Sequence, residues 1–336
     1  MKDIIVFRST ERGNHSWDVY DREGVITLQP RRVLKPTDKL FVMGSCFSIL
    51  IRTALEKATL KCTPDYESIP IDGSRMRIEG YDRPYFHINY FNTYTVLQEM
   101  HRCLGLWTQA DDDYWHIDRN PWQQDHPGET QSWQDPYRRL QMGRTLADIQ
   151  ELNAHINKVT FVGFKEANAF LFTFDTTEVF KQSHNGLAVG ERARFFKNDG
   201  LGGTTLHQTT FAENYANVEQ IIQLLQKHKP GCPIIFAVSP VPIGTTFAGG
   251  DVVVANMESK AVLRAVLGEI ARAYPDVIYF PAYEMAAHQS PFIAFNKDGR
   301  HIRLELSEMM TQAFIYNHYD IPGMPAPVPF PQQDIG

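Results

Sequence analysis

Short apolar runs alternate with amphipathic stretches along most of the chain. Runs with almost no polar residue occupy 39–43, 169–174, 234–238 and 277–280. Such runs are typical of strands buried on both faces of a parallel sheet. Apolar residues at helical spacing predict helices at 47–57, from 92 to 104, and at 147–158, 211–228, 256–273 and 303–317. This alternation predicts right-handed crossovers, and hence a three-layer α/β domain with a doubly wound parallel sheet of flavodoxin-like strand order.

Three segments fall outside the alternation. Residues 1–38 are polar and mixed, and we expect an N-terminal arm with a hairpin of strands at 4–7 and 25–28. Residues 107–147 hold four of the five tryptophans between prolines and glycines, which predicts a cap inserted over the sheet edge. The proline-rich tail, 321–336, is expected to be extended. Residues 39–320, with this cap inserted at 107–147, then form a single domain, with a loop at 61–83.

The first core strand ends at a motif that can carry chemistry. Gly44-Ser45-Cys46 stands between the apolar run and the following helix, so the chain turns sharply at Gly44. Such a turn places a small side chain at the carboxyl edge of a sheet, where α/β enzymes keep their active sites. Ser45 is therefore a candidate nucleophile whose hydroxyl points out of the turn, near helix amides that stabilise an oxyanion. The commoner role of serine at such a junction is to cap the helix.

Asp298-Gly299-Arg300-His301, late in the chain, supplies the groups that an attacking serine needs. A histidine takes the hydroxyl proton, and a carboxylate on the other ring nitrogen fixes its tautomer. The spacing of Asp298 and His301 lets both side chains face the same way while Arg300 points elsewhere. A simple turn or helix cap made by Asp298 is the alternative. Cys46 is a second possible nucleophile, although inward packing is the commoner role of such a thiol.

Composition narrows the possible partners. The 336 residues are 43% hydrophobic and carry a formal net charge of −6, so nucleic acid and anionic membranes are not expected partners. No apolar run reaches the length of a membrane span, and residues 1–22 lack the apolar region of a secretory signal, which predicts a cytoplasmic protein. The four cysteines are scattered, which indicates reduced thiols and no zinc site. The oligomeric state stays open.

These motifs, taken in order, resemble the GSCFA family, which is similar to the SGNH/GDSL esterase and acyltransferase superfamily. The name-giving motif stands here as Gly44-Ser45-Cys46-Phe47-Ser48, with serine at its last position. Further similar segments are 89–93, 173–180, 238–241, 256–260 and 279–284. The resemblance covers about 39–318 and implies an SGNH-like fold with Ser45 as nucleophile and Asp298 and His301 as its partners. No metal or organic cofactor is expected.

The oxyanion motif of the superfamily is altered in this chain. Asp175 stands where the family usually has glycine, and Thr177 where the superfamily has asparagine. A carboxylate aimed at an oxyanion would repel it, so we expect Asp175 to turn away. The expected oxyanion and substrate-binding groups are Thr177, Asn92, Asn89 and Ser239, with the Ser45 amide. Helix capping is the alternative role of the asparagines.

The pair Ser259-Lys260 also occurs in hydrolases with a lysine base. Adjacent residues of a helix face different directions, so no second catalytic centre is expected there. Asn256 is expected to cap that helix, and Glu284 with His288 lacks a third partner for a metal site.

The expected function is serine-dependent acyl chemistry. An esterase or O-acyltransferase would act on a short acyl ester of a small molecule or glycan, with a carbohydrate or polysaccharide as the expected substrate. Trp115, Trp122 and Trp133 would form a rim that stacks on sugar faces, unless they close a local satellite core. The alternative is a glycan-binding module on the same fold that has lost catalysis.

Overall fold

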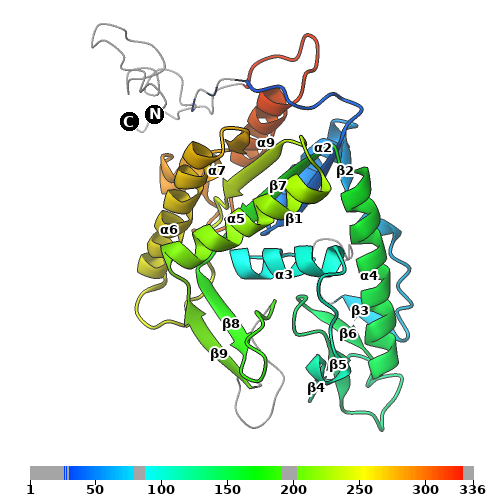
Figure 1. Ribbon diagram of the computed structural model, residues 1–336. Helices are drawn as coiled ribbons and strands as arrows, with labels where there is room; N and C mark the ends of the chain where they lie inside the picture. Colours follow the sequence, from blue (N-terminus) through cyan, green and yellow to red (C-terminus); the bar gives the residue numbers. More distant parts are fainter. Residues whose placement is uncertain (1–25, 27, 29, 79–87, 191–202, 328–336) are drawn as a thin grey trace, which may run out of the picture.

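Five parallel strands form the centre of the fold (Figure 1). The computed structural model describes residues 26, 28, 30–78, 88–190 and 203–327. The sheet has the order β11-β10-β7-β1-β2, and every neighbouring pair is parallel. Its strands are β1 (Lys39–Gly44), β2 (Lys61–Thr63), β7 (Ala169–Phe174), β10 (Ile234–Val238) and β11 (Val277–Tyr279). The predicted flavodoxin-like order is therefore confirmed, with its switch point between β1 and β7.

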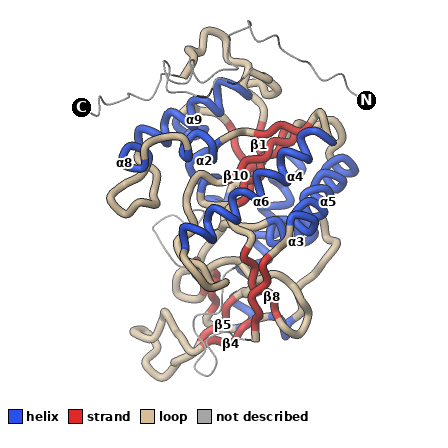
Figure 2. Tube along the Cα trace, turned by 90° about the vertical axis from the view of Figure 1, so that its left-hand side faces the viewer, coloured by secondary structure: helices blue, strands red, loops and turns tan. Residues whose placement is uncertain are grey.

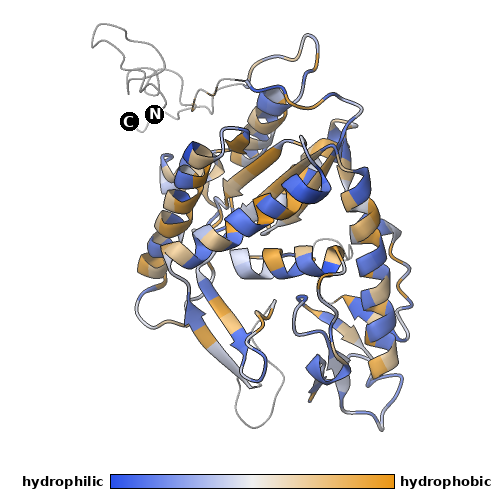
Figure 3. Ribbon diagram, in the orientation of Figure 1, coloured by the Kyte–Doolittle hydropathy of each residue, from blue (hydrophilic) through white to orange (hydrophobic). Residues whose placement is uncertain are grey.

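Helices cover both faces of the sheet because alternate side chains of each strand point to opposite faces. In β1, Leu40 and Val42 join one buried cluster, whereas Phe41 and Met43 join the other. The first cluster is closed by α2 (Phe47–Lys57), α7 (Ala282–Ala287), α8 (Pro291–Ala294) and α9 (Leu304–His318). The second is closed by α3 (Thr93–Cys103), α4 (Leu146–Glu166), α5 (Phe211–His228) and α6 (Val252–Ala273). Figure 3 shows the apolar strands between helices whose outer faces are hydrophilic.

The predicted helices are confirmed, with two changes at their ends. Helix α4 runs to Glu166, beyond the predicted end at 158. Helix α6 begins at Val252, and its N-cap is Asp251, whose Oδ1 accepts from the Val253 amide at 2.7 Å. The prediction that Asn256 caps this helix was wrong, because its Oδ1 accepts from the Ile243 amide at 3.0 Å and ties the preceding loop to α6.

A second, antiparallel sheet and a hairpin lie beyond α3, at one end of the molecule (Figure 2). The sheet has the order β3-β6-β5-β4, formed by β3 (Met76–Ile78), β4 (Trp115–Ile117), β5 (Ser132–Gln134) and β6 (Gln141–Gly143). The hairpin pairs β8 (Glu178–Gln182) with β9 (Thr204–Gln208). Strands β2 and β3 fall in the segment 61–83, so the loop predicted there was wrong in part. Each has three residues, too few to show an alternation.

The two ends of the described chain lie together beside α9. The amides of Arg31 and Arg32 donate to the Asn317 carbonyl, and the Leu34 amide donates to that of His318. The predicted strand at 4–7 lies outside the described residues, as do two of the four residues at 25–28 and the tail beyond 327. Among the helices that the structure describes, none has the length and apolarity to cross a membrane.

Candidate active site

The turn at Gly44 is built on the neighbouring strand β7. Gly44 pairs with Thr173 across the sheet and has a φ of +140°. A Cβ at this position would lie 2.2 Å from the Thr173 carbonyl oxygen, so only glycine fits. The Ser45 amide then donates to the Thr173 carbonyl at 3.0 Å and to its hydroxyl at 2.9 Å. The strand end therefore fixes the backbone of Ser45 before any ligand binds.

The Ser45 side chain takes neither of the two predicted orientations. It is fully buried, and its hydroxyl lies 2.9 Å from the Thr173 hydroxyl. The N-cap of α2 is Cys46, without a side-chain bond, so Ser45 is not the cap. The predicted outward direction of the hydroxyl was wrong, because the turn at Gly44 directs it toward β7. The Ser45 amide, expected as an oxyanion donor, is bonded to Thr173. The Tyr90 amide, which donates to the Gly44 carbonyl at 2.8 Å, holds a further segment against this strand end.

Asp298 and His301 form a hydrogen-bonded pair on the turn between α8 and α9. The Asp298 carboxylate accepts from the amides of Arg300 and His301, each at 3.0 Å, and bonds His301 Nδ1 through its other oxygen. The bond from His301, followed by the two amide bonds, lowers the pKa of Asp298 to about 2. The side chains of His301 and Asp298 are 63% and 47% exposed. The hydrogen bonds of Ser45 and His301 thus run to different partners, Thr173 and Asp298.

A pocket of about 550 Å³ opens at the carboxyl edge of the sheet. Its wall combines aromatic, amide and charged side chains. These include Phe91, Asn92, Arg139, Asp175, Glu178, Phe180, Phe247 and Arg300. Asp175 directly follows β7, next to the switch point at which ligands of open α/β sheets bind. Arg300, which was predicted to point away from Asp298 and His301, lines this pocket, so the turn that carries all three residues borders it.

A buried ion pair supports the floor of the pocket. Lys260 is 1% exposed, and its Nζ donates to Asp175 Oδ1 at 2.6 Å, to the Asp175 carbonyl at 3.0 Å and to the Val241 carbonyl at 2.9 Å. It therefore connects the end of β7 with the loop after β10. The neighbouring Ser259 hydroxyl lies 2.9 Å from that of Thr177. Both residues of the Ser259-Lys260 pair are engaged with the 175–177 turn.

Of the four predicted oxyanion and substrate-binding side chains, Asn92 alone borders the pocket. Its Oδ1 caps α3 by accepting from the Thr95 amide at 2.9 Å, while its NH₂ donates to no group in the described part of the chain. Thr177 is buried against Ser259, and Asn89 is buried as well. Ser239 is also buried and accepts from the Val241 amide at 3.3 Å.

The tryptophans of the predicted rim lie outside this pocket. Trp115 and Trp122 are buried in a satellite cluster with Ile117 and Met142, and Trp122 Nε1 donates to the Gly73 carbonyl at 2.7 Å. Trp133 is half-buried and stacks on His116, with ring centroids 4.7 Å apart. Their arrangement corresponds to the local core that was the alternative to a sugar-binding rim.

The Cys46 thiol is held in its protonated form. Burial, and then the charge of Asp175, raise its pKa to about 12, although Lys260, Arg300 and Arg139 act in the opposite direction. Since the thiolate is the nucleophilic form, this cysteine is poorly suited to attack a carbonyl near neutral pH. The same charges place the Ser45-Cys46 turn within electrostatic reach of the pocket wall.

A second pocket, of about 820 Å³, lies along β2 between α2 and α4 and is lined by none of the predicted catalytic residues.

Glu284, weighed above as a metal ligand, accepts hydrogen bonds from Arg264 and from the Tyr279 hydroxyl. Among the residues that the structure describes, no group of three His, Cys, Asp or Glu side chains is arranged to hold a metal.

Sequence reasoning missed Lys260 and Arg300 as residues of the site. A signal existed for Lys260, because a lysine at a buried helical position, three residues before Leu263, requires a buried partner. Arg300 carries no such signal, since it occupies a loop whose direction is set by contacts far away in the sequence.

The fold and the site define an α/β protein whose polar groups gather at the switch point of a flavodoxin-like sheet. The chain belongs to the GSCFA family, whose family model matches residues 39–314. Among solved structures, the chain is similar to the Clostridium thermocellum family 3 carbohydrate esterase, with 11% sequence identity and a TM-score of 0.33. That match covers 83% of this chain and 94% of the esterase. No curated protein matches the sequence.

Proposed function

We propose that this protein is a serine esterase or O-acyltransferase that uses Ser45, His301 and Asp298. The observation that carries the proposal is the Asp298–His301 pair beside the pocket. With Nδ1 bonded to the carboxylate, the ring presents Nε2 as a base. A carboxylate whose pKa is about 2 stays ionised at neutral pH and stabilises the imidazolium that forms.

The reaction runs in two steps on one serine. The Ser45 hydroxyl attacks the ester carbonyl and passes its proton to His301, and the alcohol then leaves with that proton. Water or an acceptor hydroxyl attacks the acyl-enzyme, which regenerates Ser45 and His301. The first acceptor gives hydrolysis and the second gives transfer.

The NH₂ group of Asn92 is the proposed oxyanion donor. It borders the pocket and has no hydrogen-bond acceptor in the described part of the chain, whereas the Ser45 amide is occupied by Thr173. Because Asp175 pairs with Lys260, its charge is balanced close to the carboxylate itself. This arrangement relieves the repulsion that an unpaired carboxylate would exert on an oxyanion.

Substrate binding must bring Ser45 and His301 together in this proposal. Ser45 lies at the buried edge of the sheet, while His301 is mostly exposed on a short turn. We infer that the turn at 296–302 closes over the pocket when it is filled, as loops of many enzymes do. The aromatic rings of Phe91, Phe180 and Phe247 in the wall suit the apolar faces of a sugar, so an acylated carbohydrate is the proposed substrate.

A glycan-binding module is the second candidate function. The observation that favours it is the complete burial of Ser45, with its hydroxyl bonded to Thr173. In this alternative the pocket binds a sugar, and Ser45 stabilises the end of β1.

Fluorophosphonate labelling followed by intact-protein mass spectrometry separates the two functions. Wild type, Ser45→Ala and His301→Ala are compared, with Ser48→Ala as a matched control because Ser48 is a buried serine of the same motif. Labelling of wild type and Ser48→Ala, but of neither other variant, supports the enzyme. A Cys46→Ala variant that still labels excludes the thiol. Absence of labelling in folded wild type, together with no release of acetate from acetylated sugars, contradicts the enzyme and favours the binding module.

A further inference from the structure

Two arginines from distant parts of the chain line the same pocket. Arg139 follows β5 in the region beyond α3, whereas Arg300 lies on the turn that bears His301. Asp175 and Glu178 are the carboxylates of the same wall. Whether the pocket favours an anion therefore depends on how these carboxylates are engaged.

Both carboxylates are engaged by groups of the protein. Asp175 accepts from the buried Lys260 Nζ at 2.6 Å, so that charge is balanced beneath the floor. Glu178 accepts from the Thr246 hydroxyl and from the Phe247 amide, the latter at 2.8 Å. With Lys260 included, the described residues of this region place three cationic groups against two carboxylates. Arg139 and Arg300 thus stand in a wall whose two carboxylates are both engaged by protein groups, although the whole chain has a net charge of −6.

Arg300 is oriented by one bond and retains its other donors. Its Nε donates to the Pro242 carbonyl at 2.9 Å, and its terminal nitrogens bond no group in the described part of the chain. Gly244 provides the space, because a Cβ there would lie 3.0 Å from Arg300 Cζ. A guanidinium fixed at Nε presents its terminal N–H groups to a planar or tetrahedral anion.

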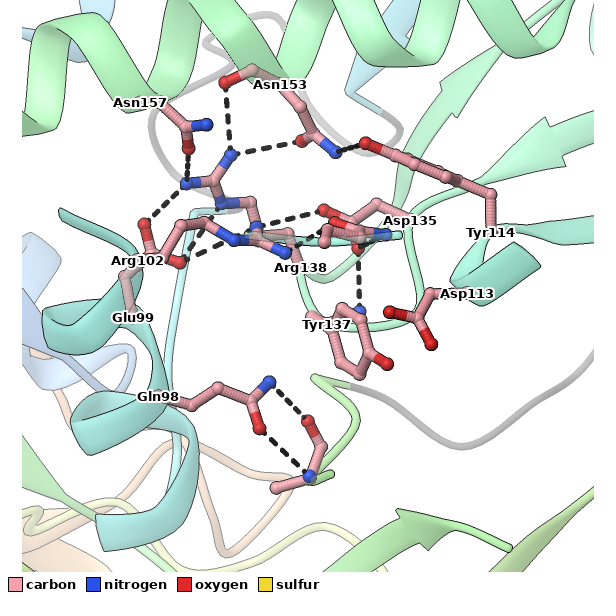
Figure 4. Close-up of polar contacts among 12 residues, drawn as sticks. Gln98, Glu99, Arg102, Asp113, Tyr114, Asp135, Tyr137, Arg138, Asn153 and Asn157 are labelled. Carbon is pink, nitrogen blue, oxygen red and sulfur yellow. Dashed lines mark hydrogen bonds and ion pairs between the residues drawn. The ribbon is translucent and has the colours of Figure 1, made fainter. Parts of the chain in front are cut away.

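Arg139 is placed by the rigid segment that carries it. The preceding Arg138 is 1% exposed and donates to Glu99 and to Asn153 Oδ1, at 3.1 and 3.0 Å. Figure 4 shows this network between the helices that bear Glu99 and Asn153. The Arg139 guanidinium lies over the Phe91 ring, 5.7 Å from its centroid. A cation held in position before binding loses little conformational freedom when a ligand arrives.

The geometry points to an anionic sugar ester as the substrate: the pocket recognises a carboxylate or phosphate on the sugar through Arg139 and Arg300. The ester part of this inference rests on the proposed function, whereas anion recognition rests on the pocket alone. A uronate and a sugar phosphate share the chemistry that two guanidinium groups bind.

Calorimetric titration of Ser45→Ala protein tests recognition without turnover. Methyl glucuronide and glucose 6-phosphate are compared with neutral methyl glucoside. At least one anionic sugar is expected to bind tenfold or more tightly than the glucoside, and the better of the two identifies carboxylate or phosphate as the recognised group. Adding Arg300→Gln or Arg139→Gln should reduce this preference by roughly tenfold, since each removes charge-assisted hydrogen bonds. Arg272→Gln, at an exposed position on α6, is the matched control and should retain the preference.

Gly244→Ala provides a second variant that changes no charge. It should displace the Arg300 guanidinium and reduce the preference without altering the circular dichroism spectrum. Equal affinity for anionic and neutral sugars, no binding of any of the three, or a preference that survives in both arginine variants overturns the inference. Anion preference in a protein that fluorophosphonate never labels contradicts the esterase alone, and labelling without anion preference contradicts this inference alone.

Discussion

Ser45 and His301, the two halves of the proposed catalytic apparatus, are held by different kinds of structure. Ser45 is buried at the edge of the parallel sheet, and its hydrogen bonds run to Thr173, 128 residues away. His301 is mostly exposed, and its side chain bonds Asp298 three residues earlier on the same turn. Ser45 is therefore part of the folded core, whereas His301 lies on a surface turn that is held by local hydrogen bonds. Substitutions around Ser45 should change stability and activity together, whereas those around His301 should change activity alone.

Replacement of the exposed His301 should have the strongest effect, and this effect should be on catalysis. His301→Ala should lower the rate of ester cleavage by roughly 10³- to 10⁴-fold, because it removes the proposed base of the serine. The midpoint of urea unfolding should stay where it is in wild type, since the side chain is mostly exposed. Steady-state kinetics and urea titration of the same preparation measure both quantities. A lower unfolding midpoint would show that His301 is a structural residue.

The second effect is on the stability of the protein, at the buried ion pair between Lys260 and Asp175. Lys260→Met leaves Asp175 as an uncompensated buried charge, which should cost about 3–5 kcal/mol of unfolding free energy. Lys227→Met, at an exposed position of α5, should unfold like wild type. The double variant Lys260→Met/Asp175→Asn should recover part of the loss, because it removes the unpaired charge. A single variant as stable as wild type would show that the ion pair does not hold the floor of the pocket.

A smaller effect is expected at the contact that places Ser45. Thr173→Val removes the hydroxyl bonded to both the amide and the hydroxyl of Ser45, which should cost about 1–3 kcal/mol of unfolding free energy. Fluorophosphonate labelling should slow in the same variant, whereas Thr173→Ser should keep both properties near wild type. Slower labelling at unchanged stability would show that activity and stability are independent around Ser45.

The smallest effect concerns acid titration of the exposed turn. The pKa of Asp298 is about 2 in the folded protein, below the value of about 3.9 of an unperturbed aspartate. Its bonds therefore stabilise the turn fully above about pH 4, and this contribution is lost as the pH falls through about 2. Carboxyl ¹³C NMR of Asp298 should give this low midpoint, and His301→Ala should move it toward 3.9. A midpoint near 3.9 in wild type would mean that the pair does not form in solution.

Much of the fold could be predicted because its elements are long and strongly patterned. The all-apolar stretch that forms β7 and the helical spacing of α5 can be read from local sequence alone. The antiparallel sheet could not be predicted, because strands of three residues, such as β4 and β5, give no usable alternation. The family motifs indicated Ser45, Asp298 and His301, but their surroundings depend on contacts far away in the sequence. The bond from Lys260 to Asp175 spans 85 residues, and that from Arg138 to Glu99 spans 39.

Arg300 and His301 are neighbours in the chain, and this adjacency connects ligand binding at Arg300 with the position of His301. The Arg300 guanidinium belongs to the pocket wall, and its backbone amide is one of the donors that hold Asp298 in place. A ligand that engaged this guanidinium, as proposed, would therefore also restrict the motion of the turn that carries the proposed base. The difference between the ligand's binding free energies for the closed and the open turn sets how far the population shifts toward the closed one. In such an arrangement the binding energy of the correct substrate would complete the proposed catalytic site, whereas water alone in the pocket would leave Ser45 and His301 apart.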